Sequence, residues 1–232
     1  MKIDIWSDIV CPFCYIGKRH LEQARAGFEH ADDVEIAWHS YELDPTASAR
    51  WDAPVAEAVA AKYGISVEQA EATQEQIAAT AAAAGLEFNW RQARPGNTFD
   101  AHRLVQLAAA SGLAAAAHER FMRAYFTEGV AVGDPAALRE LAIEVGLDAD
   151  AVDELLASDA FTNEVRQDEA LAAEIGIRGV PFFVLDEKYA VSGAQPVEVF
   201  SSALRKAWDE SHPRRTLIDV GEPGEACGPD GC

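Results

Sequence analysis

The fold is decided by the stretch at residues 2–28, KIDIWSDIVCPFCYIGKRHLEQARAGF. Polar and apolar residues alternate over 2–7, which predicts a short strand. Pro12 suits the first turn of a helix, because the N–H groups of that turn lack intrahelical partners. Apolar residues then recur at helical spacing from Tyr15 to Phe28. The sequence therefore places the pair Cys11 and Cys14 at a junction between a strand and a helix.

Two cysteines at that junction favour dithiol–disulfide chemistry. A thiolate at a helix N-terminus is stabilised by the free N–H donors and by the positive end of the helix dipole. Cys14, one turn further along, can attack a mixed disulfide formed by Cys11. We expect Cys11 to be partly exposed and Cys14 to be shielded.

Composition limits the classes of protein that remain. The 232 residues carry a formal net charge of −20, which argues against nucleic-acid and anionic-membrane partners because both need clustered Lys and Arg. Residues 1–7 read directly as a strand rather than as a signal peptide, and no apolar run approaches the length of a membrane span. We expect a cytoplasmic protein, in which close cysteine pairs are catalytic or metal-binding.

Three blocks follow one another along the chain. Strand, helix and strand signals occupy residues 1–45, with the second strand at 34–41. Residues 46–172, rich in alanine, read as helices, with helix caps expected at 97–100 and at Asp134 before Pro135. Residues 173–211 return to strands at 181–185 and 189–192, separated by a polar turn at 186–188, and to a last helix at about 196–208. This order predicts an α/β protein with a thioredoxin-like fold, discontinuous over 1–45 and 173–211, which carries an inserted α-helical domain at 46–172. Residues 212–232, rich in Pro and Gly, form a tail with a second cysteine pair.

Five motifs follow one another along the chain: SDIVCPFCYIG at 7–17, ELDP at 42–45, NT with AHR at 97–103, GIRGVPFF at 176–183 and SGAQP at 192–196. Together and in this order they resemble the DsbA-like proteins of the FrnE type. Members of that family are cytoplasmic thiol–disulfide oxidoreductases and isomerases. Their fold is the thioredoxin fold with a helical insertion. The resemblance covers nearly the whole chain.

The resemblance also implies roles for single residues. Cys11 would be the nucleophile, Cys14 the resolving thiol, and Pro181 a cis-proline beside them. Val180 would then pair with an extended substrate chain as a β-strand does. The other implied substrate-binding residues are Pro12, Phe13, Ser192 and Gly193. Substrates would be protein or small-molecule disulfides, with glutathione or a thioredoxin system as reductant and no further cofactor.

One departure from the family concerns proton transfer. Some related oxidases carry a glutamate six residues before the nucleophile, where this chain has Ile5. Asp4 and Asp8 are nearby acids. The sequence leaves open whether either of them exchanges a proton with Cys14.

The tail cysteines, Cys227 and Cys232, admit three interpretations. They can form an auxiliary dithiol that exchanges with Cys11 and Cys14, since the turn residues between them bring both sulfurs within bridging range. They can complete a four-cysteine zinc site, although a metal would quench the nucleophile. They can also have no catalytic duty. We favour the auxiliary dithiol and expect no metal.

Two other functions compete with disulfide exchange. Glutathione-dependent isomerases and transferases of the kappa-like class share this fold and insertion, but they typically have serine where Cys11 stands. A thioredoxin-like adaptor would need neither cysteine.

The histidines and tryptophans have simpler interpretations. We interpret His20, His39 and His102 as packed or surface residues, and Trp6, Trp38 and Trp90 as core aromatics.

Overall fold

The computed structural model describes residues 1–49 and 53–213. The elements of the sheet layer are β1 (Lys2–Ser7), α1 (Pro12–Ala26), β2 (Glu35–Ser40), β3 (Phe182–Leu185), β4 (Tyr189–Ser192) and α9 (Val197–Ser211). Between β2 and β3 lie α2 (Val55–Tyr63), α3 (Val67–Ala83), α4 (Phe99–Ala110), α5 (Ala114–Phe126), α6 (Pro135–Val145), α7 (Ala149–Leu156) and α8 (Thr162–Glu174).

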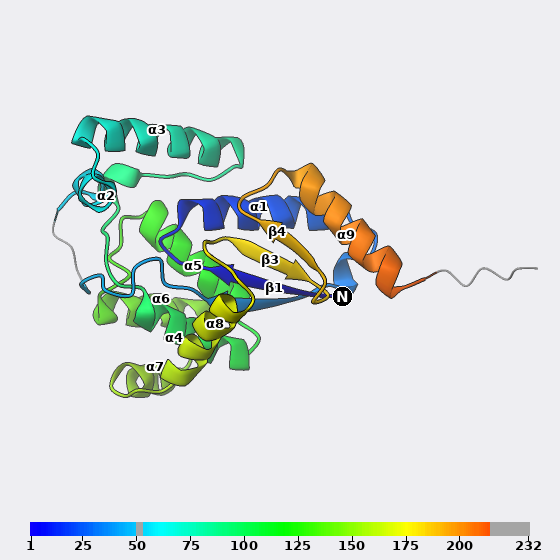
Figure 1. Cartoon of the computed structure of the whole chain (residues 1–232). Coiled ribbons are helices and arrows are strands. Elements are labelled where there is room, and N and C mark those ends of the chain that lie inside the picture. The colour runs from blue at the N-terminus through cyan, green and yellow to red at the C-terminus, as the bar shows by residue number, and fades with distance from the viewer. Residues whose placement is uncertain (50–52, 214–232) are drawn as a thin grey trace, which may run out of the picture.

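The four strands form one mixed sheet in the order β2-β1-β3-β4. β1 pairs in parallel with β2, whereas β3 pairs antiparallel with both β1 and β4. The predicted β-α-β and β-β-α units are therefore confirmed, and helices occupy the whole interval between them (Figure 1). The turn that joins β3 to β4 has positive φ at Asp186 and Glu187, as a tight hairpin turn requires.

Side chains that alternate along the strands divide the sheet into two faces. Ile5 lies opposite Phe183 in the β1–β3 register, and Phe183 packs edge-on against Phe200 of α9 at 4.8 Å. Trp6 points to the other face, where it packs with Ala172 of α8. α1 and α9 therefore cover one face and α8 the other.

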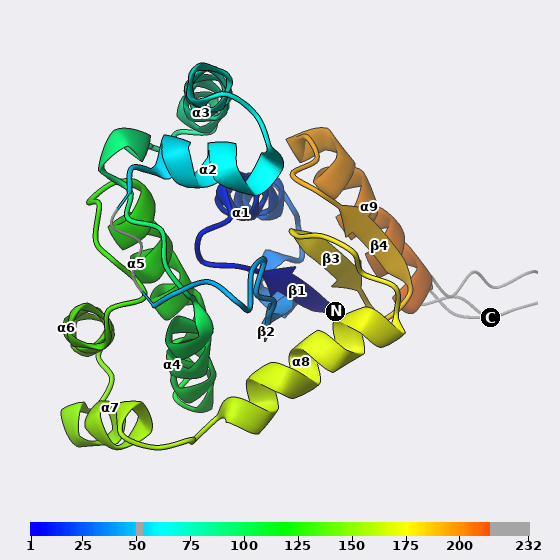
Figure 2. The ribbon, with the colours of Figure 1, turned by 60° about the vertical axis from the view of Figure 1, so that its left-hand side comes forward.

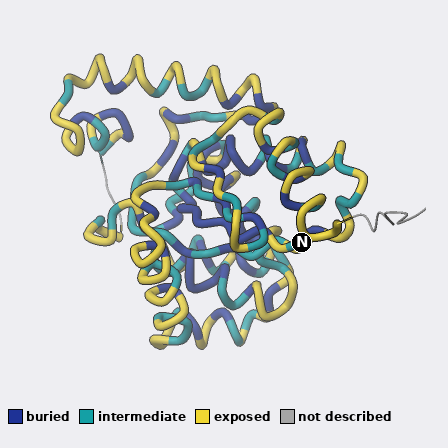
Figure 3. The backbone as a smooth tube through the Cα atoms, turned by 45° about the vertical axis from the view of Figure 1, so that its right-hand side comes forward, coloured by how far each residue is buried: buried dark blue, intermediate teal, exposed yellow. Residues whose placement is uncertain are grey.

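The helices between β2 and β3 fall into two groups in space. In the view of Figure 2, α2 and α3 lie at the top, next to α1, whereas α4, α6 and α7 lie lower and to the left. α3 is the least buried long helix, with only Ala70 and Ala81 fully buried along its 17 residues (Figure 3). Its N-terminus is fixed by a capping box between Ser66 and Gln69.

The predicted core and caps agree with the structure, with small differences. The tryptophans Trp6, Trp38 and Trp90 are buried, as expected. Asp134 caps α6 before Pro135, also as expected. The cap expected at 97–100 differs, because Thr98 is the N-cap without a side-chain hydrogen bond, while Asn97 accepts from the Phe99 N–H. In the described residues no helix is long and apolar enough to cross a membrane.

A polar network joins the sheet to α8 through His39 on β2. Its ring bonds Asp168 at 2.6 Å through Nδ1 and Asp4 at 2.8 Å through Nε2, and stacks on Trp6. Burial of the ring opposes the charged form, but the hydrogen bonds and negative charges of Asp168 and Asp4 outweigh it, so the pKa of His39 is raised. The protonated ring thus stabilises the folded state.

The stability that His39 supplies should therefore depend on pH. A raised folded-state pKa contributes fully below the unfolded value of about 6.5 and is lost as pH rises through the folded value. Replacing His39 by Gln should cost about 1.5–3 kcal/mol of unfolding free energy at pH 6, as for hydrogen bonds to charged groups, and less at pH 9. Urea denaturation at both pH values measures this. Asp168→Asn should weaken the pH dependence, and an equal cost at both pH values would contradict the assignment.

Candidate active site

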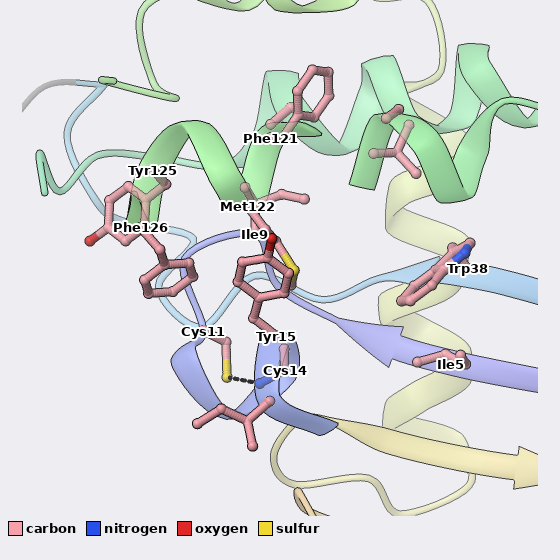
Figure 4. Close-up of a cluster of buried hydrophobic side chains, with 14 of the residues drawn as sticks. Ile5, Ile9, Cys11, Cys14, Tyr15, Trp38, Phe121, Met122, Tyr125 and Phe126 are labelled. Carbon is pink, nitrogen blue, oxygen red and sulfur yellow. Dashed lines mark hydrogen bonds between the residues drawn. The ribbon is translucent and has the colours of Figure 1, made fainter. Parts of the chain in front are cut away.

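Cys11 is the N-cap of α1, directly after the loop that leaves β1. The Cys14 N–H donates to Cys11 Sγ at 3.3 Å, drawn as the dashed line in Figure 4. The Cys11 N–H donates to the carbonyl of Asp8 at 3.2 Å. The helix N-terminus thus directs an N–H group at the sulfur, which is the arrangement that stabilises a thiolate.

Cys14 lies inside the first turn of α1 and is a buried thiol. Only 2% of its surface is exposed. Burial, followed by the hydrogen bond and charge of Cys11, raises the pKa of Cys14 well above its ordinary value. Both cysteines are free in the structure. Cys14 is therefore the protonated partner of the pair near neutral pH.

The expected exposure of Cys11 is wrong as stated. Only 3% of its surface is exposed, and the side chain of Phe126 lies beside it in Figure 4. Cys11 nevertheless lines a cavity, whereas Cys14 does not. The two sulfurs therefore differ in access through this cavity and not, as predicted, in exposed surface.

The chain segment before β3 approaches Cys11 from the other side. The Val180–Pro181 peptide bond is cis, as the resemblance implied. Cys11 Sγ lies 3.6 Å from the carbonyl oxygen of Val180, to which the thiol donates. Gly17 allows this approach, because a Cβ there would meet Pro181 Cγ at 3.0 Å and Phe183 Cζ at 3.2 Å.

A cavity of about 820 Å³ opens beside Cys11, under α2 and α3. Its volume lies in the range of small-molecule sites, and its wall is mostly apolar and aromatic. Pro12, Phe13 and Val180, three of the implied substrate-binding residues, line it. Phe13 is 46% exposed at its rim. The inserted helices and the loops beside them contribute Val55, Ala58, Val59, Tyr63, Ile65, Ile77, Phe88, Trp90, Tyr125 and Phe126.

A second, more polar cavity of about 460 Å³ lies on the far side of Val180. Pro181, Ser192 and Gly193, the other implied substrate-binding residues, line it together with Arg178. The Gly193 N–H donates to the Pro181 carbonyl at 2.8 Å, which ties the end of β4 to the cis-proline segment. Val180 lines both cavities. It therefore lies between the large, mostly apolar cavity and the smaller cavity, which Arg178 lines with its positive charge.

The two nearby acids have different surroundings. Asp4 bonds Lys2 and His39 in the network of the sheet. Asp8 is 1% exposed, lines the large cavity and lies 3.3 Å from His102, measured from Oδ1 to Nε2. His102 is thus a packed residue, as expected, but it is paired with an acid next to the cysteines.

The sequence analysis did not predict two parts of the site. These are Arg178 and the part of the cavity wall that α2 and α3 form. The Ala-rich helical pattern of 46–172 predicted the helices themselves.

The tail cysteines, Cys227 and Cys232, fall outside the described residues, so both the auxiliary dithiol and the four-cysteine zinc site stay predictions. Within residues 1–49 and 53–213 no group of three or more His, Cys, Asp or Glu side chains could hold a metal.

Comparison with known proteins places this geometry in a family. The model of the DSBA-like thioredoxin domain matches residues 2–205. The chain belongs to the DSBA-like thioredoxin domain family. The expected thioredoxin-like fold with a helical insertion is thereby confirmed, and the CxxC at the start of α1 stands in a DSBA-like domain.

The solved structures that resemble this DSBA-like chain include the following three. The probable DsbA oxidoreductase SCO1869 from Streptomyces coelicolor is 47% identical, with a TM-score of 0.86 over 100% of this chain and 98% of the other. A 2-hydroxychromene-2-carboxylate isomerase is 18% identical, with a TM-score of 0.67 over 93% and 100%. The cytosolic disulfide reductase DsbM from Pseudomonas aeruginosa is 18% identical, with a TM-score of 0.63 over 89% and 98%. The last two share the fold.

Proposed function

We propose that this protein is a thiol–disulfide oxidoreductase in which Cys11 attacks and Cys14 resolves. The observation that carries the proposal is the position of Cys11. Its sulfur caps α1, faces the Val180 carbonyl and lines the large cavity, while Cys14 lies behind it as a buried thiol. The 47% identity to a probable DsbA oxidoreductase supports the same reaction class.

The reaction follows from this asymmetry. The Cys11 thiolate attacks a substrate disulfide, forms a mixed disulfide and releases the first substrate thiolate. Cys14 then loses its proton and attacks Cys11 Sγ, which releases the second substrate thiolate and leaves a Cys11–Cys14 disulfide. The substrate gains the two electrons that the cysteine pair loses. The same steps in reverse oxidise a substrate dithiol, so the redox-active pair needs no further cofactor.

The two cavities indicate how a substrate binds. An extended chain can pair with Val180, as in β-strand addition. The group on one side of the scissile disulfide then enters the apolar cavity, where Pro12 and Phe13 contact it. The group on the other side meets Pro181, Ser192, Gly193 and the cation of Arg178. This arrangement suits a disulfide with one apolar and one anionic partner, which includes adducts of glutathione.

Three finer assignments belong to the same proposal. Glutathione or a thioredoxin system reduces the Cys11–Cys14 disulfide, because the polar cavity can hold a carboxylate at Arg178. The protein works in the cytoplasm, where such reductants keep thiols reduced. Cys227 and Cys232 serve as an auxiliary dithiol of the tail.

A glutathione-dependent isomerase is the second candidate, favoured by the size and apolar wall of the large cavity. A cysteine at position 11 and a buried thiol at position 14 argue against it, since isomerisation on a bound thiol adduct needs no second cysteine.

Assays of disulfide reduction and of isomerisation separate the two functions. The wild-type protein should accelerate the reduction of insulin disulfides by dithiothreitol and the reduction of 2-hydroxyethyl disulfide by glutathione. No acceleration of either reaction would contradict the oxidoreductase proposal. Glutathione-dependent cis–trans isomerisation of a chromene-derived carboxylate, retained at full rate in Cys14→Ser, would support the isomerase instead.

A further inference from the structure

Two hydroxyl groups on the wall of the large cavity, those of Thr98 and Tyr125, have no hydrogen-bond partner within residues 1–49 and 53–213. Each of the two residues is at most 5% exposed. Thr98 is the N-cap of α4, but its side chain caps no N–H group of that helix. Buried hydroxyls are ordinarily paired, because an unpaired one costs free energy in apolar surroundings. The two hydroxyls are therefore available to a ligand that enters the cavity.

The fold brings the two hydroxyls to the same end of a helical hairpin. α4 and α5 pack against each other and are joined by the short connection 111–113, so they run antiparallel. The start of α4, where Thr98 lies, is therefore next to the end of α5, where Tyr125 lies. Figure 4 shows the hydroxyl of Tyr125 turned away from the packed side chains of Tyr15 and Met122. Both hydroxyl-bearing residues line the cavity that Cys11 also lines.

The carboxylate of Asp8 lies at this end of the hairpin as well. His102 connects it to Thr98, because the His102 N–H donates to the Thr98 carbonyl at 2.9 Å and the ring Nε2 lies 3.3 Å from Asp8 Oδ1. Burial, and then the negative charge of Asp8, raise the pKa of Tyr125, so its hydroxyl stays protonated and can donate. Asp8 also lines the cavity. Two hydroxyl donors and one carboxylate acceptor thus share one part of the cavity wall.

The charged side chains at the mouth of the cavity are in a different situation. Lys62 and Asp44 line the cavity too, but each side chain is 43% exposed and they bond each other, with 3.8 Å between Nζ and Oδ2. Water solvates both of these charges, so neither depends on a ligand for a partner. The need for a partner from the ligand is confined to the buried hydroxyls.

An uncharged amide is the ligand group that fits this part of the wall. Its carbonyl oxygen has two lone pairs and can accept from both hydroxyls, while its N–H donates to the carboxylate of Asp8. A carboxylate would meet the negative charge of Asp8 in apolar surroundings, where like charges repel strongly. An ammonium group would bond Asp8 but would give the two hydroxyl protons no acceptor. An apolar group would displace water and leave all three groups without a partner.

We propose that Asp8, Thr98 and Tyr125 form an amide subsite, which selects substrates that carry an uncharged amide on an apolar group. The apolar group fills the cavity beside Cys11, and the amide bonds the three side chains. No covalent bond changes at this subsite, so its residues determine specificity. The subsite deepens the proposed function and rests on it for the role of the cavity.

Binding of four naphthalenes that lack a thiol tests the amide subsite without disulfide exchange. The ligands 2-naphthamide, 2-naphthoate, 2-(aminomethyl)naphthalene and 2-methylnaphthalene share one ring system and differ in a single group. Fluorescence anisotropy of the naphthalene ring gives a Kd for each ligand with the full-length reduced protein. We expect the wild type to bind 2-naphthamide at least about tenfold more tightly than 2-naphthoate or the amine. Asp8→Asn should reduce the preference over 2-naphthoate.

Tyr125→Phe and Thr98→Val remove one hydroxyl each and keep the shape of the side chain. Each should weaken the binding of 2-naphthamide about threefold to tenfold, as expected for the loss of one hydrogen bond. Binding of 2-methylnaphthalene should change by less than about twofold. Tyr63→Phe is the matched control, because it removes the hydroxyl of a tyrosine that lines the same cavity but is 68% exposed. It should change the binding of neither ligand.

Three results would overturn the inference. They are wild-type binding of 2-naphthoate or of the amine that is as tight as binding of 2-naphthamide, an equal change for the amide and methyl ligands in both hydroxyl variants, and no binding of any of the four ligands. The first and the last need no variant, so they decide even if a variant does not fold. Insulin reduction by the same wild-type preparation tests the proposed function separately. If reduction is retained, the proposed function stands whatever the ligands show, whereas its absence contradicts the proposed function.

Discussion

Replacing Cys11 by serine is expected to lower disulfide turnover by more than about 10³-fold, because a hydroxyl cannot replace a thiolate as nucleophile. The free energy of unfolding should change little, since serine has nearly the shape of cysteine and can cap α1 equally well. Insulin reduction and urea denaturation measure the two quantities.

Cys14→Ser is the matched control for this variant. It keeps the nucleophile and lacks the resolving thiol, so it should form a mixed disulfide with substrate once and then stop. Mass spectrometry of the unreduced protein should find the substrate on Cys11. Substantial turnover by Cys11→Ser, or an adduct on another cysteine, would contradict the assigned roles.

Filling the large cavity is expected to have the second largest effect, and the effect should depend on the substrate. Ala58 lines the cavity from α2. Ala58→Trp should lower kcat/KM about 10- to 100-fold for a mixed disulfide of glutathione with a naphthyl thiol, which corresponds to roughly 1.4–2.7 kcal/mol of lost apolar burial. Reduction of 2-hydroxyethyl disulfide, which is too small to fill the cavity, should change much less.

Ala79→Trp provides the control for this variant. Ala79 is exposed on α3 and does not line the cavity, so both substrates should react as with the wild type. Equal loss for the large and small substrates in Ala58→Trp would indicate a general defect and would contradict the assignment of the cavity to substrate.

The strand, turn and helix signals near the cysteines were sufficient to predict the sheet layer. β1 and β4 have the predicted bounds, and β2, β3 and α9 differ by only one to three residues at their ends. These segments carry strong local signals, namely alternation, Pro12 and the polar turn at 186–188. The resemblance to a known family added the cis bond before Pro181, which local sequence alone does not distinguish from a trans bond.

The surroundings of Cys11 could not be predicted in the same way. Cys11 lines a cavity together with Phe88, Tyr125 and Phe126, which are distant from it in sequence and reach the site through tertiary packing. The pairing of Asp8 with His102 spans 94 residues, and no spacing rule connects them. Helical periodicity shows which face of a helix is apolar, but not which cavity that face will enclose.

The order in which iodoacetamide modifies Cys11 and Cys14 in the reduced protein at pH 7 tests the central claim most directly. Peptide mass mapping over time gives a separate rate for each cysteine. Our account predicts that Cys11, which caps α1 and lines the cavity, is modified first, and that Cys14, a buried thiol with a raised pKa, reacts only when the protein unfolds. Equal rates for the two cysteines, or faster modification of Cys14, would contradict it.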